Sequence, residues 1–144
     1  MIRKFQNTDL KNVLNIWLEG NLQAHSFIAA KYWQENYDKM ANVYLPQAEI
    51  WVYEDQQKIK GFIGLQGDYI AGLFVAKDAQ GQGIGTKLLD YVKKERIQLS
   101  LQVYEKNSHA ISFYLAANFY IVKKELDKNV QEIEYLMEWK NNAD

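Results

Sequence analysis

Apolar and polar residues along the first part of the chain follow the two periods that distinguish strands from helices. The short apolar segment Ile2–Phe5 predicts a strand. Beyond it, apolar residues recur every three or four positions, as on one face of a helix, at Leu10, Val13, Leu14, Trp17 and Leu18. Thr8 or Asp9 can cap this helix at its start. Gly20 and Asn21 are expected to end it.

A second helical pattern runs from about Ala30 to Tyr44. Its predicted apolar face consists of Trp33, Tyr37, Met40, Ala41 and Tyr44. The pair Leu45-Pro46 is expected to stop this helix, because the residue before a proline avoids the helical conformation. Two strands are predicted next, Glu49–Glu54 and Ile59–Leu65, joined by a polar hairpin turn at residues 55–58.

The middle of the chain holds an almost wholly apolar segment, Tyr69–Val75. Strands of this kind lie at the centre of a sheet and are buried on both faces. A glycine-rich loop, Gln80–Gly85, follows it and opens a helix whose apolar face carries Ile84, Leu88, Leu89 and Val92. The next strand is predicted at Leu99–Tyr104.

The last third of the chain predicts a short helix and two strands. Asn107 or Ser108 can cap the helix, which is expected to end near Ala117. Strands are expected at Phe119–Val122 and at Ile133–Trp139, where apolar residues alternate with glutamates. The element order β-α-α-β-β-β-α-β-α-β-β predicts an α/β (α+β) fold, in which helices pack on a mixed sheet.

Composition narrows the class of protein. A chain of 144 residues, 48% hydrophobic and 14% aromatic, predicts one globular domain over residues 1–144. Its net charge of −1 argues against a nucleic-acid partner. The chain has no cysteine, which excludes disulfides and a cysteinyl acyl-enzyme. No segment reads as a membrane span or a signal peptide, so we expect no membrane partner and a cytoplasmic location. Monomer and homodimer both remain open.

The loop Gln80-Gly81-Gln82-Gly83-Ile84-Gly85-Thr86 carries the clearest chemical signal. Glycines let backbone N–H groups approach a ligand, and the start of a helix adds unpaired donors and partial positive charge. Together they predict a phosphate or pyrophosphate cradle. The spacing does not fit a Walker A loop, and the third glycine comes one residue too early for a dinucleotide fingerprint. A dinucleotide site and a turn without a ligand remain the alternatives.

At these spacings the residues resemble a known family. The sequence Gln80-x-x-Gly83-x-Gly85 after an apolar strand is similar to the acetyl-CoA pyrophosphate motif of the GNAT superfamily of N-acetyltransferases. The later residues that repeat that family's pattern are Asn107, Ala110, Phe113-Tyr114 and Asn118-Phe119. Asn118 replaces the family's usual glycine, which a left-handed backbone tolerates. More narrowly, the chain resembles the small, stand-alone bacterial YjaB-type branch, through His25-Ser26-Phe27, Leu45-Pro46-x-Ala48-x-Ile50-Trp51-Val52 and Gly61-Phe62-Ile63.

The resemblance implies a fold, a donor and a binding site for it. It implies a mixed, mostly antiparallel sheet of six to seven strands, with a splay between the fourth and fifth strands that holds acetyl-CoA. The residues it assigns to acetyl-CoA are Leu73, Phe74, Val75, Gln80, Gly81, Gln82, Gly83, Ile84, Gly85, Thr86, Asn107 and Tyr114. For Asn107, a plain role as helix cap is the alternative.

By the same resemblance, Tyr114 is the expected catalytic residue. A hydroxyl near the sulfur can protonate the thiolate that leaves when an amine attacks a thioester. The base that deprotonates the amine stays open between Asp68, Glu105 and His109. With no cysteine to carry the acetyl group, transfer is expected to be direct, through a ternary complex, and no metal is expected.

The acceptor is expected to bind near the segment that follows the first helix. The candidate residues are His25, Phe27, Trp33 and Asp68, with Tyr32 and Tyr37 as further aromatic walls. A core role is the alternative for the aromatic residues, and a hydrogen-bonded structural histidine is the alternative for His25. The acceptor itself, a protein lysine, an N-terminus or a small amine, stays open, as does the convergence of Glu35, Asp38, Glu49 and Asp68 into an acidic groove. A second function class is an acyl-CoA-binding sensor with little turnover.

Overall fold

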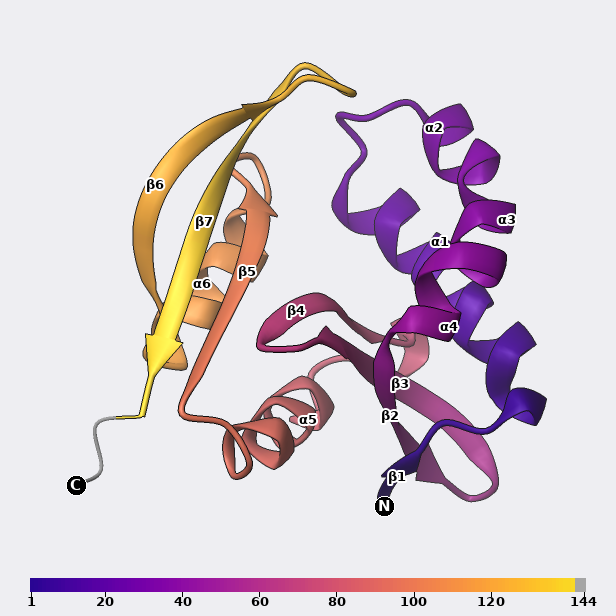
Figure 1. The fold of residues 1–144 in the computed structure, drawn as a ribbon. Coiled ribbons are helices and arrows are strands. Elements are labelled where there is room, and N and C mark those ends of the chain that lie inside the picture. Colours follow the sequence, from indigo (N-terminus) through magenta and orange to yellow (C-terminus); the bar gives the residue numbers. More distant parts are fainter. Residues whose placement is uncertain (142–144) are drawn as a thin grey trace.

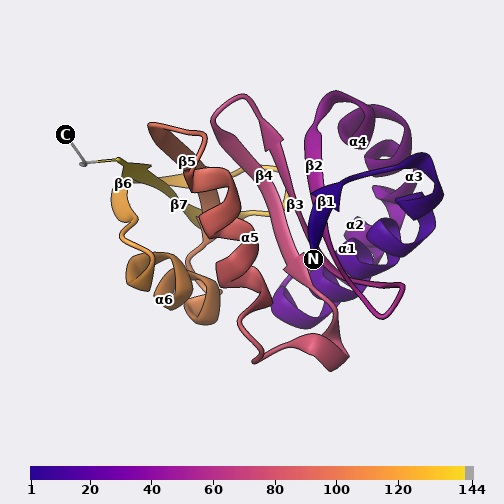
Figure 2. The same cartoon turned by 90° about the horizontal axis from the view of Figure 1, so that it is seen from below.

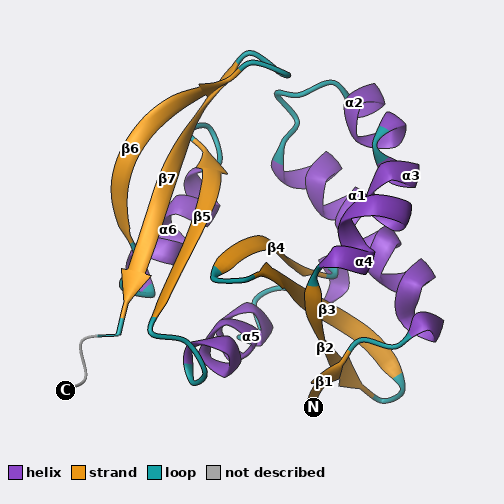
Figure 3. Cartoon of the chain, in the orientation of Figure 1, coloured by secondary structure: helices purple, strands orange, loops and turns teal. Residues whose placement is uncertain are grey.

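A computed structural model describes residues 1–141 as one seven-stranded sheet with helices on both faces (Figure 1, Figure 3). The strands are β1 (Ile2–Lys4), β2 (Glu49–Asp55), β3 (Lys58–Gln66), β4 (Tyr69–Val75), β5 (Gln98–Tyr104), β6 (Tyr120–Asp127) and β7 (Glu132–Lys140). The helices are α1 (Leu10–Ala24), α2 (Ala30–Glu35), α3 (Tyr37–Lys39), α4 (Leu45–Gln47), α5 (Ile84–Lys93) and α6 (Ser108–Ala116). Short helical turns of other kinds are η1 (Asn7–Asp9), η2 (Met40–Tyr44) and η3 (Lys77–Ala79).

The sheet is split near its middle. Its strand order is β1-β2-β3-β4-β5-β7-β6, and every neighbouring pair is antiparallel except β4 with β5. These two strands run parallel and pair only where Tyr69 lies opposite Ser100. Beyond that point they diverge, as Figure 1 shows. The predicted mixed, mostly antiparallel sheet with a splay between its fourth and fifth strands is therefore confirmed.

A β-bulge in β4 lies next to the point of divergence. Gly64 of β3 pairs with Gly72, but the following residue Leu65 pairs with Ile70, so Ala71 has no partner of its own. An extra residue of this kind bends its strand and increases the local twist. The bulge therefore helps to turn the later part of β4 away from β5.

The expectation that the apolar strand is buried on both faces was wrong. In β4 only Ile70 is buried, and Ala71 is exposed. The strand lies centrally in the order of the sheet, but one of its backbone edges has no neighbouring strand beyond Tyr69. Its apolar side chains therefore border a gap as well as the core.

Two hydrophobic cores lie on opposite faces of the sheet. One joins α5 and α6 to strands of both halves of the sheet and includes Leu88, Leu101 and Met137. The other packs α1 to α4 against β2 and β3 around Val13 and Phe62. Figure 2 shows the two groups of helices on different sides of the sheet. Within residues 1–141, no helix is both long and apolar enough to cross a membrane.

The first helix is longer than predicted. It passes through Gly20 and Asn21 and ends at Ala24. A Cβ on Gly20 would lie 2.6 Å from the ring of Phe74, so this glycine allows close packing of α1 on β4 rather than ending the helix. The expected capping by Thr8 or Asp9 is not present at α1, since neither side chain caps its N–H groups. The Asp9 carboxylate instead accepts the Gln6 N–H and pairs with Arg3.

The second predicted helix is a series of short turns. Its range is divided among α2, α3 and the π-helical turn η2, and α4 follows it directly. Pro46 does not stop the chain's helical path, because it lies in the first turn of α4, where its missing N–H is tolerated. Hydrophobic periodicity alone does not reveal such breaks.

The remaining elements follow the prediction except for the length of β6. Two successive residues with positive φ, Gln56 and Gln57, form the hairpin turn. Asn118 has φ 71°, the left-handed conformation expected of it. The sixth strand extends to Asp127 rather than Val122, and most of its residues are exposed because it is an edge strand.

Candidate active site

The glycine-rich loop forms an open cradle at the N-terminus of α5. Gly81 and Gly83 both have φ +80°, a left-handed conformation that favours glycine. No atom lies within 4 Å of where a Cβ on either glycine would be. Within the described chain, no backbone N–H of residues 81–86 donates a hydrogen bond, and Lys87 begins the helical ladder by donating to the Gly83 carbonyl. Such free donors at a helix N-terminus suit a phosphate group.

The neighbouring side chains hold this loop in place without filling it. The Gln80 amide donates to the Val75 carbonyl at 3.2 Å and to the Gln23 side chain at 3.3 Å, which ties the loop to the end of β4 and to α1. Ile84 is buried in the core, so only its backbone faces the loop. The cradle therefore fits a pyrophosphate held by backbone groups rather than by side-chain charge.

Tyr114, the predicted catalytic residue, projects from α6 into the core around β5. Its side chain is 8% exposed, and its ring packs edge-on against Phe113 and Phe119. Among residues 1–141 its hydroxyl has no hydrogen-bond partner. Burial, and secondarily the nearby Tyr69, raise the pKa of Tyr114 above its usual value. The hydroxyl is therefore protonated at neutral pH and free to donate.

A chain of side-chain hydrogen bonds links α1 to the start of α6. The Asn21 amide donates to the Trp17 carbonyl at 2.9 Å, and the Asn21 oxygen lies 2.9 Å from Nδ1 of His25. Nε2 of His25 lies 3.1 Å from Nδ2 of Asn107. The Asn107 oxygen in turn accepts the Ala110 N–H at 3.1 Å, which caps α6.

The outer bonds of this chain determine the state of His25. Because the Asn21 amide nitrogen and the Asn107 oxygen are already engaged, Nδ1 carries the proton and Nε2 accepts from Asn107. Burial lowers the pKa of His25 to about 4, so the ring is neutral at neutral pH. The ring also stacks on Trp33 and contacts Phe27 and Tyr104 edge-on. His25 thus connects the end of α1 to the start of α6.

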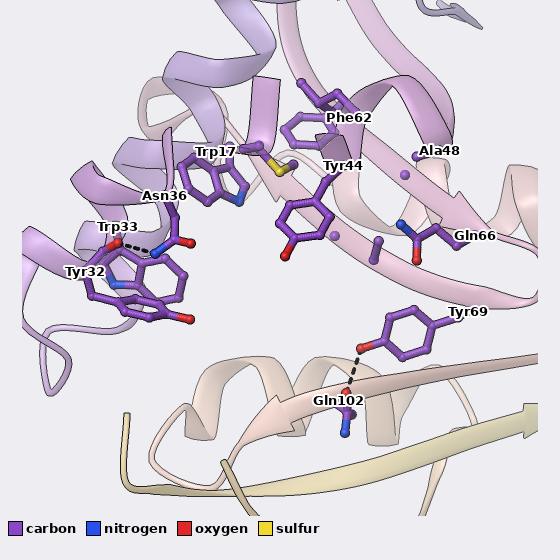
Figure 4. A pocket seen from close by; sticks show the side chains of 15 residues that line it. Trp17, Tyr32, Trp33, Asn36, Tyr44, Ala48, Phe62, Gln66, Tyr69 and Gln102 are labelled. Carbon is purple, nitrogen blue, oxygen red and sulfur yellow. Dashed lines mark hydrogen bonds between the residues drawn. The ribbon is translucent and has the colours of Figure 1, made fainter. Parts of the chain in front are cut away.

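On the α1–α4 side of the sheet lies a cavity of about 440 Å³ (Figure 4). Its residues come from α1, α2, η2 and α4 and the residues next to them, from β3 and β4, and from Gln102 of β5. They include Trp17, Tyr32, Trp33, Asn36, Tyr44, Phe62, Gln66, Tyr69 and Ala71. Walls of aromatic and aliphatic residues with a few polar groups are typical of small-molecule and side-chain sites.

Two residues that the sequence did not single out connect the cavity to the splay. The hydroxyl of Tyr69 on β4 donates to the Gln102 side chain on β5 at 2.9 Å. Figure 4 shows this bond along one side of the cavity. Burial raises the pKa of Tyr69 and the nearby Glu134 and Glu125 raise it further, so the hydroxyl stays protonated. From sequence, a tyrosine at the start of an apolar strand is expected to be a packing residue. The hydrogen bond from Tyr69 to Gln102 could therefore not be predicted.

The predicted acceptor residues are only partly brought together. Trp33 lines the cavity, whereas His25 and Phe27 lie beside it, in contact with Tyr104. Asp68 lies in the β3–β4 turn, where its carboxylate is 3.5 Å from the Arg96 guanidinium. Its backbone carbonyl accepts the Ser100 N–H where β4 and β5 meet.

The residues considered as the general base or as parts of an acidic acceptor groove do not lie together. Glu49 also pairs with Arg96, and Glu35 pairs with Lys31, so the four carboxylates considered from the sequence do not form one groove. Glu105 accepts the Tyr135 hydroxyl at 2.7 Å. His109 is exposed on α6. Within the described chain, no group of three or more histidine and acidic side chains could hold a metal ion.

Comparison with known sequences gives a consistent result. A family model described as an acetyltransferase (GNAT) domain matches residues 46–121. Peptidyl-lysine N-acetyltransferase YiaC of Escherichia coli (strain K12) is 38% identical over 140 residues, which cover 96% of each chain. Peptidyl-lysine N-acetyltransferase YjaB of Salmonella typhimurium (strain LT2) is 30% identical over 128 residues, with 88% of each chain covered.

Solved structures share the fold over nearly the whole chain. The solution structure of apo-form YjaB from Escherichia coli superposes with a TM-score of 0.84 and 25% identity, covering 96% of each chain. The PaiA N-acetyltransferase of Thermoplasma acidophilum, solved in complex with coenzyme A, has a TM-score of 0.82 and 20% identity over 98% of each chain.

Proposed function

Since the chain belongs to the GNAT acetyltransferase family, we propose that this N-acetyltransferase uses acetyl-CoA and transfers the acetyl group to the side-chain amine of a lysine in a protein. The observation that carries the proposal is the splay, with a free anion cradle at the end of β4 and a cavity on the α1–α4 side. The lysine as acceptor is supported by the names of relatives such as YiaC.

The chain's own residues divide the work of binding the donor. The N–H groups of residues 81–86 hold the pyrophosphate, and the free edge of β4 at residues 73–75 pairs with the pantetheine arm. Asn107 retains one amide hydrogen beyond its bond to His25 and can offer it to the arm. Bound acetyl-CoA supplies an activated thioester, which is the reacting group.

Tyr114 acts as the proton donor. Its protonated hydroxyl has no partner within the described chain and can donate to the sulfur as negative charge develops there. A thiolate that lies beside the Tyr114 hydroxyl shares the burial that raises the pKa of Tyr114. Burial raises the proton affinity of the thiolate too, which keeps the proton transfer feasible. The acceptor amine enters through the cavity lined by Tyr69 and Gln102, and attack is direct because the chain has no cysteine.

Calorimetric titration with acetyl-CoA, CoA and NAD, followed by a lysine-peptide assay read by mass spectrometry, tests the function. We expect acetyl-CoA to bind and the peptide to gain one acetyl group. Binding without transfer to any peptide or small amine would instead favour an acyl-CoA sensor. Binding of NAD alone would overturn the proposal.

Tyr114→Phe tests the catalytic role. It is expected to lower kcat by about a hundredfold, the usual scale of a lost proton donor, and to leave acetyl-CoA affinity nearly unchanged. The substitution removes no hydrogen bond within residues 1–141, so the fold should persist. Tyr120→Phe, on the exposed edge strand β6, is the matched control and should keep full activity. An unchanged kcat in Tyr114→Phe would exclude Tyr114 as the donor.

A further inference from the structure

Among the carboxylates on one face of the C-terminal half of the sheet, three lie close together; Glu132, opposite Asp127 on the same face, pairs with Lys106 at 3.1 Å. The strand register places Tyr104 of β5 opposite Glu134 of β7, which in turn lies opposite Glu125 of β6. Asp127 lies two residues further along β6, on the same face, and accepts the Tyr104 hydroxyl at 2.9 Å. We call Glu125, Asp127 and Glu134 the carboxylate face.

The two lysines beside this face, Lys106 at Glu132 and Lys123 at Glu125, form no ion pair with Glu134 or Asp127 among residues 1–141. Its hydrogen bonds come from neutral donors, with the Gln102 amide 3.2 Å from Glu134 and 3.4 Å from Glu125. Among residues 1–141, no Lys, Arg or His nitrogen lies within 4.0 Å of Glu134 or Asp127 in an ion pair, and Glu125 has only Lys123 at 3.8 Å. Burial and the two other carboxylates raise the pKa of Glu134, as expected for like charges held together.

The carboxylate face adjoins the cavity. Gln102, which binds two of the carboxylates, is also a wall of the cavity and the partner of Tyr69. Across the cavity, the pKa of Tyr32 on α2 is raised first by burial and then by Asp127 and other groups including Glu134, so these carboxylates lie near α2. A ligand in the cavity therefore lies beside them.

A second, independent feature indicates a peptide in this cavity. Trp17 lines it and is 8% exposed, and its indole N–H has no acceptor within the described chain. Figure 4 shows the Trp17 ring nitrogen turned toward the open centre of the cavity. The Trp17 N–H is thus open to the cavity, unlike that of Trp33, which is buried without a partner among residues 1–141, and a peptide carbonyl in the cavity would give Trp17 an acceptor.

We propose that the carboxylate face binds a cationic side chain next to the acceptor lysine, so that the enzyme prefers lysines with a neighbouring arginine or lysine. This inference rests on the proposed function and specifies the substrate for the same site. An ion pair here would relieve the repulsion among Glu125, Asp127 and Glu134, while Trp17 holds the peptide backbone.

Three peptides that differ only beside the acceptor lysine, with Arg, Gln or Glu there, test the proposal. The wild-type enzyme is expected to show the highest kcat/KM for the Arg peptide and the lowest for the Glu peptide. In Glu134→Gln the ratio between the Arg and Gln peptides should fall about fivefold, as expected for the loss of roughly 1 kcal/mol from one ion pair. The Gln peptide gives the reference rate in this ratio, so a general loss of activity cancels.

Controls separate the possible outcomes. Glu95→Gln removes an exposed carboxylate beyond the end of α5 and should leave every ratio unchanged. Calorimetry of the Arg peptide with each variant adds a binding measurement, and unchanged acetyl-CoA affinity checks the fold of Glu134→Gln. Equal losses on all three peptides, or ratios equal in wild type and variant, would overturn the inference and leave the lysine acetyltransferase intact. Failure of every peptide to react would overturn the proposed function as well.

Discussion

For His25 the sequence left two roles open, a residue of the acceptor site and a structural histidine, and its hydrogen bonds support the structural one. A histidine beside a serine after a helix predicts a polar contact, and the contact is present, but its partners are Asn21 and Asn107 rather than a free cavity wall. Nothing in the sequence brings together residues 82 positions apart. The backbone roles of the glycines, in contrast, are readable because a positive φ is a local requirement.

The neutral state of His25 predicts a specific pH dependence of stability. Its pKa is about 4 when folded and about 6.5 in an unfolded chain, so protons bind preferentially to the unfolded state between these values. The free energy of unfolding is expected to be unaffected by His25 above pH 6.5 and to fall by at most about 1.4 kcal/mol per pH unit below it, down to about pH 4.

Urea denaturation of wild type and His25→Gln at pH 7 and pH 5 measures this effect. In His25→Gln the free energy of unfolding should fall less between pH 7 and pH 5 than in the wild type. In His109→Gln, which removes an exposed histidine, it should fall as much as in the wild type. A decline of equal size in all three proteins would show that His25 is not the cause.

At the scale of elements, patterns with strong local causes were predicted best. The strand at Tyr69–Val75 and the start of α5 have the expected places. The prediction of one long second helix failed, because the break at Asn36 and the π-helical turn after Lys39 leave the apolar period unchanged. The length of β6 failed because an edge strand exposes both faces, which removes the alternation.

Gly83 in the cradle before α5 has a matched control in Gly67, which lies outside the cradle. Gly83→Ala and Gly67→Ala each place a Cβ at a left-handed residue, with φ +80° and +61°, and each Cβ meets open space. Both variants are expected to lose roughly 1–2 kcal/mol of stability. Only Gly83→Ala should also weaken acetyl-CoA binding, by about tenfold or 1.4 kcal/mol, because Gly67 lies at the opposite end of β4. Equal affinities by calorimetry would argue against a cradle at Gly83.

For the whole molecule, the resemblance to the GNAT family was confirmed, and with it the splay that periodicity alone did not indicate. A sequence pattern reports which side chains are apolar, but the divergence of β4 from β5 depends on one bulge and on a pairing reduced to Tyr69 and Ser100. The same divergence explains why a strand of apolar residues is only half-buried. The carboxylate face escaped prediction because it forms only when β5, β6 and β7 are in register.

Amide hydrogen exchange measured by mass spectrometry can detect binding of acetyl-CoA in the gap between β4 and β5. The edge of β4 toward β5 has no strand partner beyond Tyr69, so peptides covering residues 70–76 should exchange more slowly once acetyl-CoA is added. Peptides covering residues 51–53, which pair with strands on both sides, should change little. Binding by calorimetry without protection at 70–76 would place the donor elsewhere.

Binding of the proposed donor in the gap of the sheet would also make the lifetime of the protein depend on the cellular concentration of that donor. A ligand that binds only the folded chain adds about 2.7 kcal/mol to stability when its free concentration is a hundred times its Kd. With donor bound between β4 and β5, fewer molecules would be unfolded at any moment and open to proteases. When acetyl-CoA runs low, the amount of enzyme would then fall together with the rate at which it works.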